Sequence, residues 1–521
     1  MKKFATIALC AAMVLGMGAC SGGENGGNGG GGSKGSINVH YYAGGFGVEA
    51  FNSLSADYKA LTGVNVNWKP SYSQGEIQQL VNSRQEQYDI VMPLLNMYAA
   101  QDSGKLENLD DVYNAIPSGE QTAIKDKMNQ DMRAYLQASD GHYYQMVSND
   151  SVSAICYNAD TLDEAFGEGN WALPLTTKQL LTMSDSLRAK GYYAFSTSTA
   201  INYYWDYIGT VWWAQYEGLE SFNNYYEGKY LDGGEWKYGP EINDAQGRTV
   251  ALDTLSAIMS SSNGRMHALS ANMNFTDAQR AFLGRGFVDD KKKVAFMVNG
   301  DWLENEMSST LIASPQDIGM MRAPVVSELA TKLASVKTEE RLVQIVTAVD
   351  ENKTYTETAT GELSDLTEAD FEHVRQARLM VYTATPNYPI GIPSNRPAAK
   401  KQLAKDFLVY LYSDRAQRII AQQLQGLCYP AGYDVLSDTS VQMSNFVRSR
   451  FESFGNDKIN IFPRNSSTLV YLGGLSDTPG AGSGIDFQLW SGSKSSALLS
   501  ASKTNLEKNW ENISKYITKE N

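Results

Sequence analysis

The alternation of strand-like and helix-like segments between residues 37 and 92 places the strongest constraint on the fold. The run "INVHYY" is rich in β-branched and aromatic residues, and "VNVNWKP" and "YDIVMP" are two further segments of this kind. Between them, apolar residues recur at steps of three and four, as on one face of a helix. Strands alternating with helices of this length predict a parallel sheet with helices on its faces.

The length of the chain predicts more than one such body. With 521 residues it is too long for a single hydrophobic core. A second α/β body is expected to start near "VSAICYNAD" at residues 152–160, followed by a helix in "LTTKQLLTMSDSLRAKG" and a buried strand in "VAFMV". The sequence therefore predicts an α/β protein of two lobes.

The N-terminus predicts export and a membrane anchor. A short basic segment, an apolar run and "LGMGAC" have the order of a secretory signal over residues 1–19. Small residues before Cys20 resemble a bacterial lipobox, in which this cysteine is acylated and becomes the first residue of the mature protein. The Gly-rich residues 20–36 then form a flexible tether. We expect an extracytoplasmic protein held to the bacterial membrane through Cys20; the alternative is ordinary cleavage near Ala19 and release.

Charge and composition exclude several kinds of partner. The formal net charge of −14 repels nucleic acid and anionic lipid, so neither is expected to bind directly. No later stretch has the roughly 18 consecutive apolar residues that span a bilayer. Four scattered histidines without a CxxC or HExxH motif predict neither a metal nor a cofactor. For Cys156 and Cys428, two separate buried thiols are favoured over a single disulfide.

An ordered set of segments resembles a known family. "DIVMPLLNMYAAQDSGKLENLDD", "KVAFMVNGDW", "DIGMMRAPV" and "IPSNRPAAKKQLAKDFLVYLYSDRAQRIIAQQLQG" are similar, in this order, to the extracellular solute-binding proteins of ABC importers. The likeness is greatest to the carbohydrate-binding group, family 1, which includes maltose-binding protein. It implies a two-lobe, type II periplasmic-binding-protein-like fold, with a ligand cleft between the lobes and a hinge that the chain crosses several times.

The resemblance also implies where the chain crosses between the lobes. The crossings would lie near residues 147–152, 322–326 and 427–433. One lobe would then contain residues 37–148 and 327–428, and the other residues 153–322 and 433–521. Residues 337–380 would be an insertion relative to shorter family members.

The ligand contacts are carried over from the family by motif position. They come from loops at strand ends, from the first crossing, from the aromatic stretch "AINYYWDYIGTVWWAQYEG" and from the "NGDW" turn. The resemblance implies this set of ligand-binding residues: Gly45, Phe46, Asn96, Tyr98, Asn149, Asp150, Tyr203, Tyr204, Trp205, Asp301 and Trp302.

These residue types suit a sugar. Flat aromatic rings can bury the apolar C–H face of a pyranose, at about 25 cal/mol per Å² of apolar area, while carboxylates and amides bind its hydroxyl groups. Trp302 beside Asp301 and Trp205 beside Asp206 each combine a ring with an acceptor. Within the aromatic stretch, Trp212 and Tyr216 are instead expected to pack in the core, because a buried aromatic stripe is the commoner arrangement.

The resemblance therefore implies a binding protein and not an enzyme. It would act as a monomer that captures a carbohydrate, expected to be an oligosaccharide, and delivers it to the permease subunits of an ABC importer.

A secreted glycoside hydrolase is the alternative, but it needs two carboxylates about 5–10 Å apart. Glu304 and Glu306 follow Trp302 at a two-residue step, which points them to different helix faces. A peptide, polyamine or organic acid ligand also remains open, with Arg322 the only candidate to bind an organic acid.

Overall fold

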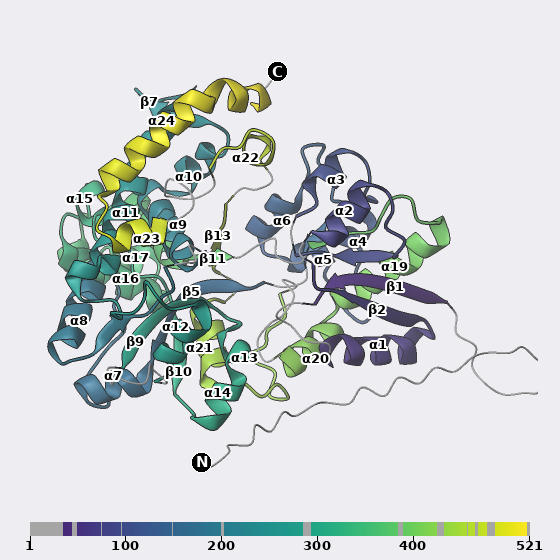
Figure 1. Cartoon of the computed structure of the whole chain (residues 1–521), viewed down its shortest axis with the longest axis horizontal. Helices are drawn as coiled ribbons and strands as arrows, with labels where there is room; N and C mark the ends of the chain where they lie inside the picture. The colour runs from purple at the N-terminus through teal and green to yellow at the C-terminus, as the bar shows by residue number, and fades with distance from the viewer. Residues whose placement is uncertain are drawn as a thin grey trace, which may run out of the picture.

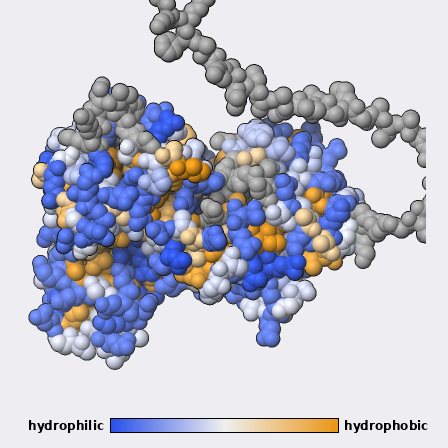
Figure 2. All heavy atoms as spheres, turned by 90° about the horizontal axis from the view of Figure 1, so that it is seen from below, coloured by the Kyte–Doolittle hydropathy of each residue, from blue (hydrophilic) through white to orange (hydrophobic). Residues whose placement is uncertain are grey.

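The computed structural model shows two lobes, each with its own sheet (Figure 1). It describes residues 35–43, 49–73, 75–94, 96–147, 150–199, 203–284, 293–383, 389–424, 432–455, 457–463, 467–476 and 485–517, and only the backbone of residues 49, 203 and 204. Two large hydrophobic clusters form separate cores. One lies around β5 (Val152–Asn158) and β9 (Val294–Gly300), and the other around β1 (Ser36–Tyr42) and β3 (Ile90–Met92). The face in Figure 2 is largely hydrophilic, with smaller apolar areas.

Lobe 1 contains the parallel sheet that the sequence predicts. Its strand order is β2-β1-β3, and both pairs are parallel. A short ladder of β4 with β12 lies beside it. The strands are β1 (Ser36–Tyr42), β2 (Asn65–Ser71), β3 (Ile90–Met92), β4 (Met146–Val147) and β12 (Pro389–Ile390). The helices are α1 (Glu49–Thr62), α2 (Glu76–Asn82), α3 (Tyr98–Asp102), α4 (Asp110–Asn114), α5 (Ile124–Lys127), α6 (Gln130–Leu136), α19 (Ala398–Leu411) and α20 (Asp414–Leu424).

The predicted α1 periodicity is right except at its C-terminal end. Phe51, Leu54 and Tyr58 are buried in the core, whereas Leu61 is 53% exposed. After β12 the chain forms two helices, α19 and α20, which meet around Ser413.

Lobe 2 contains a mixed sheet in the order β13-β11-β5-β9-β6, with β10 also paired to β5. Its strands are β5 (Val152–Asn158), β6 (Tyr193–Phe195), β9 (Val294–Gly300), β10 (Ile318–Met321), β11 (Met380–Thr383) and β13 (Ile459–Ile461). A separate hairpin consists of β7 (Lys229–Asp232) and β8 (Glu235–Tyr238). Helices cover both faces, since apolar residues of β5 and β9 enter two different clusters.

The helices of lobe 2 come from two distant parts of the chain. Before β11 they are α7 (Ala159–Phe166), α8 (Thr177–Ala189), α9 (Tyr203–Glu217), α10 (Leu219–Tyr225), α11 (Gln246–Met259), α12 (Phe275–Phe282), α13 (Leu303–Glu306), α14 (Ser308–Ala313), α15 (Leu329–Lys332), α16 (Glu339–Asp350), α17 (Tyr355–Thr358) and α18 (Glu368–Leu379). After α20 they are α21 (Asn445–Ser453), α22 (Thr468–Tyr471), α23 (Ile485–Trp490) and α24 (Ser495–Ile513). The Thr176 side chain caps α8 by accepting from the Gln179 amide.

The expected assignment of residues 327–383 to lobe 1 is wrong. Gln215 on α9 donates a hydrogen bond to the Ala377 carbonyl at 2.9 Å and accepts one from the Val326 amide at 3.1 Å. The apolar faces of α16 and α18 enter the same core as α9. The 337–380 insertion therefore belongs to lobe 2, because this is where its apolar surface is buried.

The second crossing is accordingly not at residues 322–326. Val325 pairs with the backbone of Leu175 and Thr177 inside lobe 2. The chain passes to lobe 1 between β11, which pairs with β5 and β13, and β12, which pairs with β4. The first passage lies between β4 and β5, and the third follows α20. Among the described residues, no helix is both long and apolar enough to cross a bilayer.

Candidate functional site

The directions of the strands place several strand ends along one edge of the lobe 2 sheet. β11 runs parallel to β13, and β6 runs parallel to β9, whereas β5 runs antiparallel to both β11 and β9. The register pairs Thr383 with Val152 and Gly300 with Ser153. The carboxyl ends of β9, β11 and β13 and the start of β5 therefore lie together. Ligands of open α/β sheets bind outside such carboxyl ends.

The corresponding edge of lobe 1 faces this one. The ends of β1, β2 and β3 are level, since Tyr42 pairs with Ser71 and Tyr41 pairs with Met92. Beyond these ends, aromatic rings of the two lobes meet. The Tyr98 ring lies 5.8 Å from that of Tyr471, measured between centroids.

Two further contacts join the lobes at the same place. The Tyr135 ring of α6 lies 4.3 Å from the Phe462 ring, which directly follows β13. The hydroxyl of Tyr471 donates a hydrogen bond to Asp102 at the end of α3. The strand-end edges therefore form two facing walls with aromatic contacts between them.

Trp302 lies on the lobe 2 wall and is positioned by a glycine. Its indole ring lies against Gly300, where an added Cβ would be 2.3 Å from the ring. The backbone of the intervening Asp301 donates to the Val152 carbonyl at 3.1 Å and so ties this turn to β5. The ring packs partly on the lobe 2 core and is half-buried. Trp302 is thus a fixed aromatic surface at the carboxyl end of β9.

A buried ion cluster lies directly beside the Trp302 turn. The Arg450 Nε atom is 3.4 Å from Oδ2 of Asp301, which also accepts from the Val152 amide at 3.2 Å. Arg450 also donates to the Asp150 carbonyl, and Lys458 pairs with the Asp150 carboxylate. Burial raises the pKa of Asp301 to about 6, although the Arg450 charge acts in the opposite direction.

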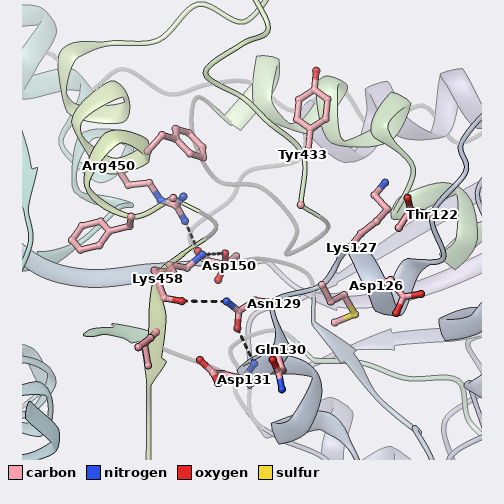
Figure 3. Close-up of a pocket in the computed structure, with 16 residues that line it drawn as sticks. Thr122, Asp126, Lys127, Asn129, Gln130, Asp131, Asp150, Tyr433, Arg450 and Lys458 are labelled. Carbon is pink, nitrogen blue, oxygen red and sulfur yellow. Dashed lines mark hydrogen bonds and ion pairs between the residues drawn. The ribbon is translucent and has the colours of Figure 1, made fainter. Parts of the chain in front are cut away.

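A polar cavity of about 620 Å³ lies between the lobes at this cluster (Figure 3). Asp150, Arg450 and Lys458 line one side, and residues 126–131 of lobe 1 line the other. Asn129 donates to the Lys458 carbonyl at 3.3 Å, and the Asn460 amide donates to Asp131 at 3.3 Å. The lobes are therefore joined by hydrogen bonds at the hinge.

Comparisons with known proteins support the architecture. No protein-family model matches the chain, and a search of the curated proteins finds no match. Among solved structures, "SBP RafE in complex with raffinose" is similar with a TM-score of 0.56 and 13% identity, covering 91% of this chain and 99% of that one. The apo-form of RafE from Streptococcus pneumoniae has a TM-score of 0.59 and 12% identity, covering 92% and 98%.

The chain has the two-lobe, type II periplasmic-binding-protein-like fold. The likeness extends over nearly the whole length of the RafE structures, so it includes both lobes. At identities of 12–13% it concerns the fold and not the ligand.

Within this fold, part of the predicted site lies at the facing walls. Trp302 is at the lobe 2 edge, and Asn96 is half-buried in the loop after β3. Tyr98 is 4% exposed and contacts Tyr135 and Tyr471. The backbone of Tyr203 and Tyr204 starts α9. Gly45, Phe46, Asn149, Cys20 and Cys428 lie outside the described residues.

Other residues that were predicted to contact a ligand instead contact residues of the protein itself. Trp205 is fully buried and packs edge-on against Phe195, so the prediction that its ring meets a ligand is wrong. Its position in the first turn of α9 faces the core, which a single sequence did not distinguish from the cleft. The carboxylates of Asp150 and Asp301 hold Lys458 and Arg450.

The sequence patterns did not indicate the aromatic residues that bring the lobes together. Phe462 and Tyr471 lie in the segment after β13, far from the motifs that carried the resemblance. Tyr72, which directly follows β2, is 80% exposed. The available signal for Tyr72 and Phe462 is an aromatic residue placed just beyond a strand.

The groups considered for alternative functions are paired elsewhere. Glu304 accepts from Ser444, and Glu306 accepts from Gln279. Arg322, the arginine considered for binding an organic acid, is paired with Asp350 inside lobe 2. The described part of the chain contains no cluster of three or more potential metal ligands. Cys156 is a free, buried thiol whose pKa is raised by burial.

Proposed function

We propose that this protein is the substrate-binding lipoprotein of an ABC importer. It captures a carbohydrate, an oligosaccharide, between its two lobes and delivers it to the permease without chemical change. The mature chain acts as a monomer outside the cytoplasm and is anchored through an acyl group on Cys20. This proposal includes the ligand class, the transporter and the anchor.

The observation that carries the proposal is the placement of Trp302. Its half-buried indole is fixed on Gly300 at the strand-end edge of lobe 2, which faces the aromatic edge of lobe 1. An indole at this position can bury the C–H face of a sugar ring. The complex of RafE with raffinose supports a saccharide as the ligand class.

Capture follows from the two-lobe geometry. A ligand that touches both walls gains contacts only when the lobes are closed, so it shifts the population towards the closed form by its difference in affinity. The chain passes between the lobes next to the Asp150 cluster, which gives this motion a defined hinge. The permease would then recognise the closed form.

A thermal-shift screen of the mature chain tests this function. The panel contains mono-, di- and trisaccharides including raffinose, together with peptides, polyamines and organic acids. A ligand that binds only the native state raises the unfolding midpoint. We expect shifts with saccharides alone; shifts with a non-sugar class and none with saccharides would contradict the proposal.

Two further measurements separate the remaining parts of the proposal. Chromatography of the bound saccharide after long incubation should return it intact, whereas cleavage products would indicate a glycoside hydrolase. Metabolic labelling with a fatty acid in a bacterial host should label the wild-type chain and not the Cys20→Ala variant. Equal labelling of both would refute the anchor.

A further inference from the structure

Tyr72 is an exposed aromatic residue that is not among the residues of the proposed site. Its side chain is 80% exposed, the largest fraction among the described aromatic residues. It directly follows Ser71, the last residue of β2. Single exposed aromatic rings are common on protein surfaces, so only the position of Tyr72 in the fold can indicate a function for it.

The turn that presents this ring is fixed on both sides. Ser71 is 3% exposed, and its hydroxyl donates to the Glu76 carboxylate at the start of α2. The same hydroxyl accepts from the Ser73 amide at 3.2 Å. The Ser71 carbonyl accepts from the Ala43 amide at 2.9 Å. Tyr72 is therefore held outward by ordered neighbours and is not part of a free terminus.

Strand register places this turn on the wall that faces lobe 2. Ser71 pairs with Tyr42, which lies one residue beyond the Tyr41–Met92 pair of β1 and β3. The chain after β3 leads directly to Tyr98, whose ring contacts Tyr471 of the opposite wall. Adjacent strands lie about 4.8 Å apart, so the end of β2 is about 10 Å from that of β3 along the same edge. Figure 1 shows β1 and β2 side by side in lobe 1, and β3 pairs with the other edge of β1.

We propose that Tyr72 is the lobe 1 ring that packs on the bound saccharide when the lobes close, opposite Trp302. The inference rests on the proposed function and adds a residue that determines affinity for the ligand. A phenol ring offers an apolar face to the sugar and a hydroxyl to its rim. Because the ring is 80% exposed, contact with a bound saccharide would remove apolar area from water that the fold itself leaves uncovered.

The experiment compares Tyr72→Ala and Tyr72→Phe with Tyr238→Ala by isothermal titration. Tyr238 is the matched control, because it is 44% exposed at the end of β8 in the separate hairpin. The probe is raffinose or, if raffinose gives no thermal shift, the saccharide with the largest one. We expect Tyr72→Ala to raise the Kd at least about tenfold, Tyr72→Phe to raise it less, and Tyr238→Ala to leave it within about twofold.

The outcomes distinguish this inference from the function on which it rests. Unchanged unfolding midpoints for all three variants, with weaker binding in the Tyr72 variants alone, support the role of Tyr72. A wild-type protein that binds a saccharide and a Tyr72→Ala variant with the same Kd would overturn only the Tyr72 contact. A wild-type protein that binds no saccharide would overturn the proposed function as well.

Discussion

Asp301 and Arg450 form a buried ion pair, with 3.4 Å between Oδ2 and Nε, that joins the Trp302 turn to the hinge. Their side chains are 4% and 3% exposed. Arg450 also holds the carbonyl of Asp150 on the segment between β4 and β5. The pair therefore connects the proposed ligand surface to the segment proposed as the hinge.

Replacing Arg450 should destabilise the protein strongly. Arg450→Met leaves the Asp301 carboxylate without its opposite charge and the Asp150 carbonyl without its Arg450 donor, and breaking a buried pair typically costs about 3–5 kcal/mol. The free energy of unfolding in urea measures this loss. Arg415→Ala is the control: Arg415 is 59% exposed in its pair with Asp57, and such a pair contributes at most about 1 kcal/mol. Equal losses in both variants would contradict the structural role of the cluster.

The pH dependence of stability should contain a contribution from Asp301. Burial raises its pKa in the folded state from 3.8 to about 6, so between these values the folded protein binds more protons than the unfolded chain. This contribution to stability is present below pH 4 and is lost as the pH rises through 6. The shift of about two units corresponds to about 3 kcal/mol at most.

Asp301→Asn isolates this contribution, because the other carboxyl groups titrate in both proteins. We expect the stability of the variant relative to wild type to increase between pH 4.5 and pH 7, measured as the difference in free energy of unfolding at each pH. A difference that stays constant over this interval would show that Asp301 is ionised throughout.

The sequence predicted the elements of each lobe better than their assembly. Local periodicity located β1 to β3 and α1, because each segment buries one face wherever it packs. Residues 337–380 were misplaced because an amphipathic helix does not specify its partner. The core contacts of α16 and α18 with α9 are visible only in three dimensions.

The candidate site was predictable to a similar extent. Trp302 could be found because it follows a buried strand and a turn. Trp205 could not be distinguished from a ligand contact, because its direction depends on the rotation of α9. Phe462 and Tyr471 belong to a segment whose position depends on contacts with both lobes.

Removing the Trp302 ring should abolish or greatly weaken saccharide binding. Trp302→Ala takes away the aromatic surface fixed on Gly300, and we expect the saccharide-induced rise in the unfolding midpoint to disappear. Trp236→Ala on the β7–β8 hairpin is the matched control, because this half-buried tryptophan lies in the separate hairpin of lobe 2. A full thermal shift in Trp302→Ala would refute the placement of the ligand on this wall.

Trp205 should affect stability and not ligand contact. Trp205→Ala opens a cavity beside Phe195 and should cost about 3–5 kcal/mol. Trp205→Phe retains more of the volume and should cost less. Titrations at a temperature where both variants remain folded should give a Kd within about threefold of wild type. A large loss of affinity in a folded Trp205→Phe protein would indicate a direct role in binding.

The contact of Tyr471 with Asp102 and Tyr98 should favour the closed arrangement, since these residues belong to opposite walls. Tyr471→Phe removes one hydrogen bond, whose net contribution is about 0.5–1.5 kcal/mol. We expect apparent saccharide affinity to fall about two- to tenfold, because fewer molecules are closed, and the radius of gyration without ligand to increase in X-ray scattering. Tyr192→Phe is the control, because it removes a tyrosine–carboxylate bond to Glu164 inside lobe 2. Equal effects of the two substitutions would mean that the bond from Tyr471 does not report on lobe closure.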